Sequence, residues 1–313
     1  MTKEKLKIII DTDPGHDDVM AILMLLAYKN IEIKAITTVA GNSTIENVTR
    51  NTQLVLDLAR RKIPLFSGAE KPLKRELIKA DVHGQSGLDG LPLINVKADL
   101  NYLAVEKIIE IVENDPGEIT ILALGPLTNL AEAFLKKPDL PGKIKQIVIM
   151  GGAIEVCGNK NRVAEFNFFV DPEAAKIVMD SAVQKVLVPL DACNDIVMTN
   201  REIDRFENGK IGEALAKMMQ PYVENLAKYE GISGAAMYDP LAAYYLINPA
   251  AFILQPMDVQ VETEGELTRG MSVAERRAVA DRNLNVDVAV KINANKFLDD
   301  FVKAVVKIDQ CKQ

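Results

Sequence analysis

Four aspartates lie close together near the start of the chain, directly after a run of three isoleucines. Asp11, Asp13, Asp17 and Asp18 fall within eight residues, and a Pro-Gly turn separates the first two from the last two. Carboxylates gathered in this way repel one another unless a cation or strong hydrogen-bond donors offset their charge. A hard metal ion bound by oxygen, calcium or magnesium, is the simplest explanation, and a solvated acidic turn is the alternative.

The residues around these aspartates place them at the end of a buried strand. The apolar residues 6–10 predict that strand, and apolar positions on one helical face predict a helix over about residues 17–28. Asp17 and Asp18 then lie in the first helical turn, where the helix dipole also favours negative charge. The dipole therefore accounts for part of the cluster without a metal.

Short apolar segments alternate with amphipathic segments along most of the chain, and polar or glycine-containing turns follow the apolar ones. This alternation predicts an α/β fold with a doubly wound, mostly parallel central sheet and helices on both of its faces. The predicted strands cover residues 6–10, 33–39, 64–67, 119–124, 145–150 and 186–190.

Two stretches depart from the alternation. Residues 71–98 are rich in Gly, Lys and Asp and predict a long mobile loop. Residues 201–247 predict a helical insertion, with breaks expected at Gly209, at Pro221 and at residues 231–234. Because no linker rich in Pro, Gly or Ser divides the chain, we expect residues 1–313 to form a single domain.

Three finer features are expected from local sequence. Residues 43–46 have the spacing of a capping box in which Ser43 would begin a helix that runs to about residue 61. Asp239 precedes a proline and is expected at the N-cap or in the first turn of a short helix. Residues 259–262 and 286–292 alternate apolar and polar positions, as the two strands of a late hairpin would.

Composition and charge exclude several classes of protein. The 313 residues are 48% hydrophobic, and no apolar run approaches the roughly 20 residues that span a bilayer. The net charge of −7 argues against nucleic acid as a partner, and the lack of a signal-like N-terminus predicts a cytoplasmic location. Cys157, Cys193 and Cys311 are widely spaced, so neither a zinc site nor a disulfide framework is expected.

Polar turns follow several of the predicted strands, and the carboxyl ends of parallel strands share one edge of a sheet. We expect these turns to converge, without a lysine or arginine among their side chains. Such a site suits calcium or magnesium together with a neutral sugar, and it suits a phosphate poorly. The converging residues would be the four aspartates, Asn42, residues 124–129, 150–167 and 191–195, and Asp239.

The segment from Asp11 to Asp18 resembles the N-terminal signature of the nucleoside hydrolases, the inosine-uridine preferring family. Six further motifs support this resemblance and follow in order across nearly the whole chain. Each alone is weak, but the ordered set is highly specific. They are Val39-Ala40-Gly41-Asn42, His83-Gly84-Gln85-Ser86-Gly87, Gly125-Pro126-Leu127-Thr128-Asn129, Met150-Gly151-Gly152, Ala164-Glu165-Phe166-Asn167 and Asp171-Pro172-Glu173-Ala174-Ala175.

The resemblance implies a calcium site and an adjoining ribose site. In the family, calcium is held by side chains that match Asp13, Asp18 and Asp239 and by a backbone carbonyl that matches Leu124. Asp11 would then support its neighbours. The ribose would be held by the residues that match Asp17, Asn42, Met150, Asn159, Glu165 and Asn167.

The reaction that the resemblance implies is calcium-dependent hydrolysis of the N-glycosidic bond of purine or pyrimidine ribonucleosides to ribose and free base. A metal-activated water would attack the anomeric carbon through an oxocarbenium-like transition state, which nearby carboxylates stabilise. Asp13 is expected to act as the general base, because a metal ligand lies within reach of that water.

The sequence departs from the family pattern directly before Asp239. Many relatives carry a histidine there, which protonates the leaving base, but this chain has Tyr238. A phenol, with an ordinary pKa of about 10, is a weaker acid than imidazolium. Tyr238 is thus the candidate leaving-group donor, and the preference for purine or pyrimidine stays open.

Three aromatic side chains, those of His83, Tyr222 and Tyr229, could surround the base. His83 would either close over the base or be solvated in its loop, and His16 is expected to be a scaffold residue. Tyr222 and Tyr229 would either line the base pocket or pack in the core.

Two other functions are open at this point. A haloacid dehalogenase-type phosphatase also places Asp-x-Asp after its first strand, but Pro14-Gly15 replaces the hydroxyl residue expected there. A noncatalytic, calcium-dependent ribose- or nucleoside-binding protein would result if the absent histidine marks lost activity. The resemblance also implies a homo-oligomer, either a dimer or a tetramer.

Overall fold

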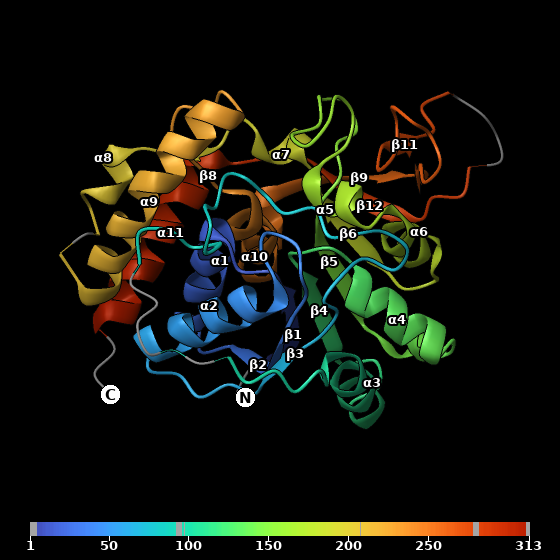
Figure 1. Cartoon of the computed structure of the whole chain (residues 1–313), viewed down its shortest axis with the longest axis horizontal. Helices are drawn as coiled ribbons and strands as arrows, with labels where there is room; N and C mark the ends of the chain where they lie inside the picture. The colour runs from blue at the N-terminus through green and yellow to red at the C-terminus, as the bar shows by residue number, and fades with distance from the viewer. Residues whose placement is uncertain (1–4, 92–95, 97, 207, 278–281, 311–313) are drawn as a thin grey trace.

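Eight strands form the central sheet of the computed structural model, which describes residues 5–91, 96, 98–206, 208–277 and 282–310. Their order across the sheet is β3-β2-β1-β4-β5-β6-β12-β9, and β12 and β9 form the one antiparallel pair among them. The mostly parallel sheet is therefore confirmed (Figure 1). The strands are β1 Leu6–Thr12, β2 Ile31–Thr38, β3 Leu65–Ser67, β4 Ile119–Ala123, β5 Gln146–Met150, β6 Lys185–Val188, β9 Phe252–Met257 and β12 Val286–Ile292.

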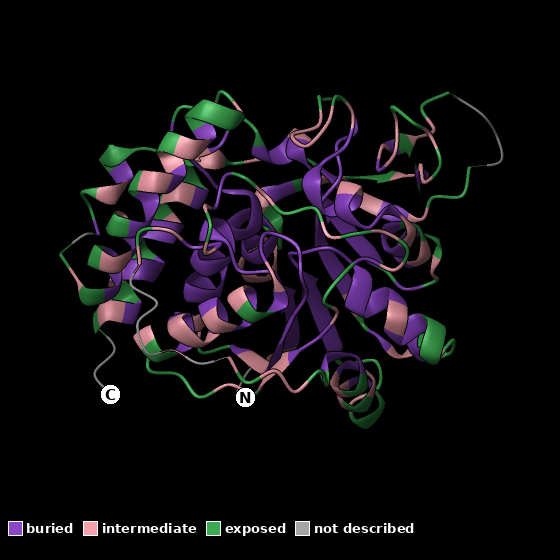
Figure 2. Cartoon of the chain, viewed as in Figure 1, coloured by how far each residue is buried: buried purple, intermediate pink, exposed green. Residues whose placement is uncertain are grey.

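Helices cover both faces of this sheet, as predicted. Side chains alternate across a strand, so Ile8 and Ile10 of β1 enter one apolar core and Ile9 enters the other. Figure 2 shows the sheet as a buried layer between helices whose outer faces are exposed. The first core contains residues of α1 His16–Leu26, α2 Ile45–Leu58, α9 Lys210–Tyr229, α10 Tyr238–Ile247 and α11 Ala294–Gln310, and the second contains residues of α3 Ala104–Asn114, α4 Thr128–Lys136 and α6 Pro172–Asp180.

None of the helices in the described ranges combines the length and the hydropathy that a bilayer span demands. Cys157 is exposed and Cys193 is buried, both as free thiols, while Cys311 lies outside the described residues. The smaller elements are α5 Phe166–Val170, α7 Leu190–Cys193, α8 Asn200–Ile203, the 3-10 turns η1 Leu140–Lys143 and η2 Pro249–Ala251, and the two-stranded ladders of β7 Val197–Met198 with β8 Ala235–Ala236 and of β10 Val259–Val261 with β11 Ser272–Ala274.

The predicted late hairpin is wrong in its pairing. β10 pairs with β11, whereas β12 lies between β6 and β9 in the central sheet. Alternation of apolar and polar residues identifies a strand, but it does not identify the neighbour that the strand binds.

Two predicted helix boundaries also differ from the structure. Pro221 does not break α9, which runs unbroken through it. Because Pro221 has no N–H, the carbonyl of Lys217 lacks its usual donor within the helix. Gly90 packs closely at this point, since a Cβ added to Gly90 would lie 2.7 Å from the Lys217 carbonyl oxygen. At α2 the N-cap is Thr44, which accepts the N–H of Asn47 (3.5 Å), so the helix starts one residue later than a cap at Ser43 would place it.

Residues 71–91 contain neither helix nor strand, as predicted for this part of the loop, while residues 92–95 and 97 lie outside the described ranges. Leu73 N donates to Asp171 Oδ2 (2.9 Å), and the Arg75 guanidinium donates to both carboxylate oxygens of Glu173 (3.2 and 2.8 Å). These bonds attach the loop to α6. Its mobility stays a prediction.

Candidate active site

The candidate site lies at the point in the sheet where the chain order reverses. β2 and β3 extend from one side of β1, and β4, β5 and β6 extend from the other. Ligands of such sheets bind in the crevice outside the strand ends at this point. Asp11 of β1 lies opposite Ala123 of β4, and Leu124 N donates to the Asp11 carbonyl (2.8 Å). The ends of β1 and β4 are thereby held together.

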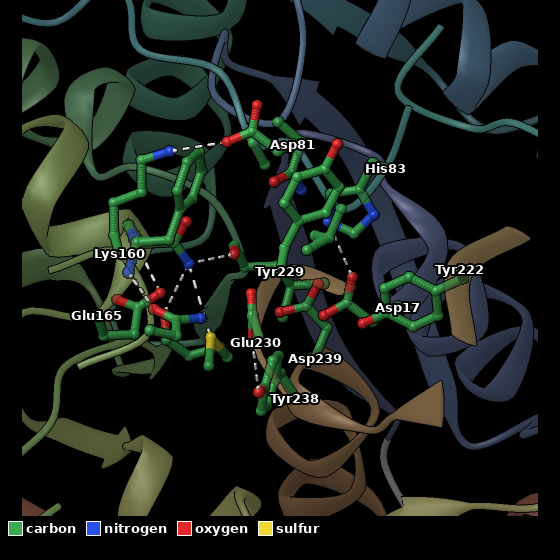
Figure 3. Close-up of a pocket in the computed structure, with 18 residues that line it drawn as sticks. Asp17, Asp81, His83, Lys160, Glu165, Tyr222, Tyr229, Glu230, Tyr238 and Asp239 are labelled. Atoms are coloured by element: carbon green, nitrogen blue, oxygen red, sulfur yellow. Dashed lines mark hydrogen bonds and ion pairs between the residues drawn. The ribbon is translucent and has the colours of Figure 1, made fainter. Parts of the chain in front are cut away.

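A pocket opens beside these strand ends (Figure 3). Leu124, Tyr238 and Asp239 line it, and Asp13 and Asp18 are fully buried. Every residue predicted to bind the substrate also lines it. These residues are Asp17, Asn42, His83, Met150, Asn159, Glu165, Asn167 and Tyr229.

Three buried carboxylates form a group that could hold a metal ion. One oxygen each of Asp17, Asp18 and Asp239 lies within 4.8 Å of the other two. Asp17 and Asp18 lie in the first turn of α1, and Asp239 lies in the first turn of α10, as predicted. Two helices distant in sequence thus direct their first turns at one point.

Asp18 is oriented by four donors. Its oxygens accept Gly15 N (2.9 Å), Asp13 N (3.3 Å) and Asn42 Nδ2 (3.2 Å), together with the hydroxyl of Thr12. The bond to Gly15 also satisfies the free N–H at the start of α1. The carboxylate therefore stabilises the helix end as well as the cluster.

Asp13 is held differently and keeps one oxygen free. Its Oδ2 accepts Asn42 N (2.6 Å), whereas its buried Oδ1 has no hydrogen-bond partner within the described part of the chain. A Cβ added to Gly41 would lie 2.2 Å from Asp13 Oδ2, and one added to Gly125 would lie 2.5 Å from Asp13 Oδ1. Both positions therefore require glycine. An orphaned buried oxygen is costly unless something binds it.

The electrostatics of the cluster favour a bound cation. Burial is the main cause that raises the pKa of Asp13, Asp17 and Asp239 well above the ordinary range. Repulsion between these carboxylates and Asp18 raises those pKa values further. Like Asp13 Oδ1, Asp17 Oδ1 is buried and has no hydrogen-bond partner in the described ranges. Oxygen-only ligands and orphaned carboxylate oxygens fit a hard divalent ion.

Glu165 caps a short helix on the opposite wall. It is the N-cap of α5, and its carboxylate accepts Asn167 N (2.8 Å) and Gly152 N (3.0 Å). Burial raises the pKa of Glu165 to about 7, although these hydrogen bonds act in the opposite direction.

Asn167 connects this wall to the strand ends. Its Nδ2 donates to the carbonyls of Leu124 (2.7 Å) and Met150 (3.2 Å). Asn159 Oδ1 accepts Phe166 N (2.9 Å). The amides predicted to bind ribose are therefore oriented by the backbone around them, and their contacts with ribose stay predictions.

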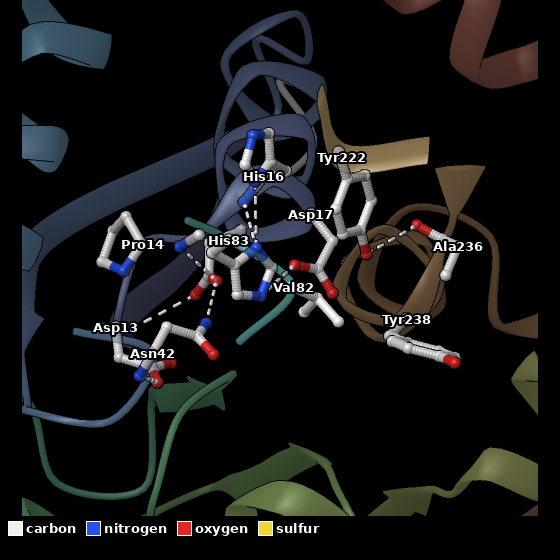
Figure 4. Close-up of polar contacts among 12 residues, drawn as sticks. Asp13, Pro14, His16, Asp17, Asn42, Val82, His83, Tyr222, Ala236 and Tyr238 are labelled. Carbon is white, nitrogen blue, oxygen red and sulfur yellow. Dashed lines mark hydrogen bonds and ion pairs between the residues drawn. The ribbon is translucent and has the colours of Figure 1, made fainter. Parts of the chain in front are cut away.

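His83 is buried rather than solvated, which rules out the solvated-loop alternative (Figure 4). The rings of His83, His16 and Tyr222 lie nearly parallel, with centroids 4.7 to 5.4 Å apart. His83 Nε2 is 3.8 Å from Asp17 Oδ1. Burial lowers the pKa of both histidines, that of His16 to about 4, so both are neutral. His16 Nε2 lies 2.9 Å from the Asp89 carbonyl, which suits the scaffold role expected for it.

The tyrosines of α9 differ in their surroundings. Tyr222 is buried in the core and also lines the pocket. The two alternatives considered for this residue, core packing and the pocket wall, are therefore both present. Tyr229 lines the pocket and is 50% exposed, which excludes core packing for this residue.

Sequence reasoning missed two charged residues of the pocket. The expectation that no lysine enters the site is wrong, because Lys160 lines it, 3.6 Å from an oxygen of Asp81. The signal was its position beside Asn159, inside a segment already expected at the site. Glu230 also lines the pocket and accepts the Tyr238 hydroxyl (3.2 Å). No motif marks Glu230, which lies just before the predicted helix break.

Comparisons with known proteins agree with this architecture. The family model described as inosine-uridine preferring nucleoside hydrolase matches residues 8–299. A Salmonella arizonae protein named pyrimidine-specific ribonucleoside hydrolase RihA is 39% identical over 94% of this chain and 96% of its own length.

Two solved structures share the fold over nearly the whole chain. The plant nucleoside hydrolase PpNRh1 has a TM-score of 0.89 and 30% identity, covering 96% of this chain and 98% of its own. A purine-preferring ribonucleoside hydrolase from Gardnerella vaginalis has a TM-score of 0.90 and 28% identity, covering 98% and 100%. Together with the match across residues 8–299, these similarities show that the chain belongs to the inosine-uridine preferring nucleoside hydrolase family.

Proposed function

We propose that the chain hydrolyses the N-glycosidic bond of ribonucleosides to ribose and free base, and that the reaction depends on calcium. The observation that carries this proposal is the buried carboxylate group of Asp17, Asp18 and Asp239, which adjoins a pocket lined by all the predicted ribose-binding residues. The relatives are named for different bases, pyrimidine in one case and purine in another, so we propose no base preference.

Asp13, Asp18, Asp239 and the Leu124 carbonyl are the proposed metal ligands. Support comes from the free Oδ1 of Asp13 and from the burial and mutual repulsion that raise the pKa of Asp13 and Asp239. Asp17 lies in the same group in the structure, although its proposed role is to hold the ribose. When bound, calcium would orient the ribose hydroxyls and make the attacking water more acidic.

The remaining steps belong to side chains of this chain. Asp13 would act as the base toward the attacking water, because a metal ligand lies within hydrogen-bond reach of that water. Asp17, Asn42 and Asn167 would hold the ribose for in-line attack, and positioning of this kind contributes on the order of 7 kcal/mol in favourable cases. The negative charge of the surrounding carboxylates would stabilise the oxocarbenium-like sugar.

Release of reducing sugar from inosine, uridine, cytidine and adenosine, with and without a chelator, tests this proposal. We expect release that stops with the chelator and returns with calcium. Binding of a nucleoside without release would favour the noncatalytic alternative. The family match leaves the phosphatase alternative without support, and phosphate release from a nucleotide would restore it.

Substitution of the proposed base and ligand gives the sharper test. Asp13→Ala should lower kcat about 100-fold or more for every nucleoside and weaken calcium binding, because base and ligand are lost together. Asp17→Asn should raise KM while calcium binding persists. Asp57→Asn, at an exposed position on α2, is the matched control. Normal activity of Asp13→Ala would overturn the assignment.

We also propose that the protein is a cytoplasmic homo-oligomer of two or four copies, as family membership suggests. Light scattering coupled to gel filtration measures the number of copies directly. A single monomeric species at micromolar concentration would contradict this part of the proposal.

A further inference from the structure

We propose that Glu230 supplies the proton that the departing base takes up, and that it delivers this proton through the hydroxyl of Tyr238. This inference rests on the proposed hydrolysis of nucleosides and adds a residue to it. Both side chains line the pocket, and Figure 3 shows them side by side.

The geometry of the pair is set by two helix ends. Glu230 follows the last residue of α9, and its N–H donates to the Leu226 carbonyl (2.9 Å). Gly231 then adopts a φ of +72°, which directs the chain away from the helix axis. Tyr238 opens α10, and its hydroxyl lies 3.2 Å from Glu230 Oε2. The carboxyl and the phenol are therefore in direct hydrogen-bond contact inside the pocket.

Tyr238 alone is a poor acid for this step. A phenol has an ordinary pKa of about 10, so little of its acidity is available near pH 7. A phenol that had to ionise in order to protonate the base would therefore oppose the reaction at neutral pH.

Glu230 has the acidity that Tyr238 lacks. Burial raises the pKa of Glu230 to about 7, although the Tyr238 hydrogen bond and the charge of Lys160 act in the opposite direction. A substantial share of Glu230 is thus protonated at neutral pH, which is the condition that favours a general acid. The titratable groups that face it are Tyr238, Tyr222, Asp17, Glu165 and Lys160.

The direction of the hydrogen bond follows the protonation of Glu230. With Glu230 ionised, Tyr238 donates its hydrogen to the carboxylate. With Glu230 protonated, the carboxyl donates to the phenol oxygen, and the phenol hydrogen is free to face the base.

The proposed step conserves atoms and charge. The C–N bond breaks and leaves its electron pair on the base nitrogen. The Tyr238 proton moves to that nitrogen while the Glu230 proton moves to the phenol oxygen. Tyr238 stays neutral throughout, and Glu230 ends as a carboxylate that regains its proton from solvent water.

A purely structural role for Glu230 would have a different effect. If Glu230 only held Tyr238 or the helix end in place, its loss would impair every substrate alike. If it supplies a proton, its loss would impair only substrates whose leaving group needs one. The test therefore compares a nucleoside with 4-nitrophenyl β-D-ribofuranoside, whose leaving phenolate is stable without a proton.

We expect Glu230→Gln to lower kcat on inosine or uridine about 100-fold, and the loss on the nitrophenyl riboside to be at least roughly tenfold smaller. Tyr238→Phe should show the same contrast between the two substrates. The double variant should lose no more than the worse single variant, because the two residues act as one relay. Glu224→Gln, at an exposed position on the same helix, is the matched control.

The pH profile adds a readout that a structural role would not change. Nucleoside kcat should fall as pH rises through about 7, where Glu230 loses its proton, and this limb should be absent with the nitrophenyl riboside. Glu165 has a similar pKa on the ribose side, so its titration would affect both substrates alike. The difference between the two profiles therefore isolates Glu230.

Equal losses of Glu230→Gln on both substrates, in a variant that melts at the temperature of the native protein, would overturn the inference. If Glu230→Gln does not fold, equal losses of Tyr238→Phe on both substrates would do the same. A native protein that releases sugar from neither substrate would overturn the proposed function instead, so the two failures are distinguishable.

Discussion

Asp13 and Asp18 belong to one short motif, yet their surroundings differ in a way that matters for metal binding. Asp18 accepts hydrogen bonds from four donors, whereas Asp13 accepts one and keeps a buried oxygen free. A carboxylate already oriented by its neighbours is a pre-formed ligand. A carboxylate with a buried oxygen that lacks a hydrogen-bond partner is stabilised more when it binds the ion. We therefore expect Asp13 to make the largest single difference to calcium affinity.

Individual site residues were predictable where they belong to motifs that follow a strand. Asn42, Glu165 and Asn167 all reach the pocket because the carboxyl ends of neighbouring parallel strands share one edge. Lys160 and Glu230 were not predicted, because irregular backbone carries no periodicity that tells where a side chain points. Only the folded chain shows that these two side chains face the same cavity.

Lys185 provides a test of burial energetics far from the proposed chemistry. Its ammonium donates to the carbonyls of Ser181 (2.5 Å) and Val183 (2.9 Å), and burial lowers its pKa to about 8. Between pH 8 and the ordinary pKa of about 10.5 the unfolded chain binds more protons than the folded one. The Lys185 contribution to the free energy of unfolding should therefore rise with pH across this window.

Lys185→Met removes this contribution, so the slope of stability against pH above pH 8 should be smaller than in the native protein. Urea unfolding at pH 7, 8, 9 and 10 measures it. Lys176→Met, at an exposed position on α6, serves as the control. Identical slopes for the native protein and Lys185→Met would contradict the burial argument.

At the scale of elements, the strands of the parallel sheet were predictable because each is a short apolar run between turn signals. The partner of β12 was not, since β10 and β9 are both short strands that precede it in the chain. The passage of α9 through Pro221 was not predictable either, because a proline inside a helical pattern predicts a break or a kink. Local pattern alone identifies neither feature.

The attachment of the 71–91 loop to α6 should influence substrate binding, since this loop carries His83 into the pocket. Arg75→Ala removes the bonds to Glu173 and the bond to the Thr263 carbonyl (2.8 Å). We expect a loss of stability on the order of 1 kcal/mol. We also expect KM for nucleosides to rise more than kcat falls, as measured by steady-state kinetics.

Lys74→Ala, at the exposed neighbouring position, is the control for Arg75→Ala. If Arg75→Ala loses stability but keeps the KM of the native protein, then the bonds of Arg75 do not influence substrate binding, and the prediction is wrong.

The turn after α9 depends on the glycine that follows Glu230. Gly231 has a φ of +72°, and a methyl group added to its Cα would meet nothing within 4 Å, so only backbone strain opposes a side chain. Gly231→Ala should therefore lower the free energy of unfolding by about 1–2 kcal/mol. Gly142→Ala is the matched control, because Gly142 has equal space and no left-handed φ. Equal denaturation midpoints for the two variants would show that α9 ends without strain.

At the scale of the whole molecule, the central sheet separates two apolar cores and leaves the charged cluster at its edge. An ion that neutralises this cluster binds the folded state and not the unfolded chain. At about 100 times its Kd, calcium should stabilise the fold by about 2.7 kcal/mol. For a chain of 313 residues the melting temperature should rise by roughly 4 °C.

Scanning calorimetry with calcium, magnesium or a chelator measures this shift. Asp13→Asn should lose most of it while Asp57→Asn keeps it. A shift that is the same in both variants would mean that calcium stabilises the protein at some other place.

The distance along the chain between Asp18 and Asp239 has a consequence for synthesis. These carboxylates meet in one group although more than two hundred residues separate them. While the ribosome is still translating α9, the emerging polypeptide already carries Asp13, Asp17 and Asp18 but lacks the carboxylate that completes the group. Contacts of such long range form late, because loop closure must come first. Translation therefore has to pass α10 before the nascent chain can assemble its cation site, and chaperones would meet the protein with that acidic centre still open.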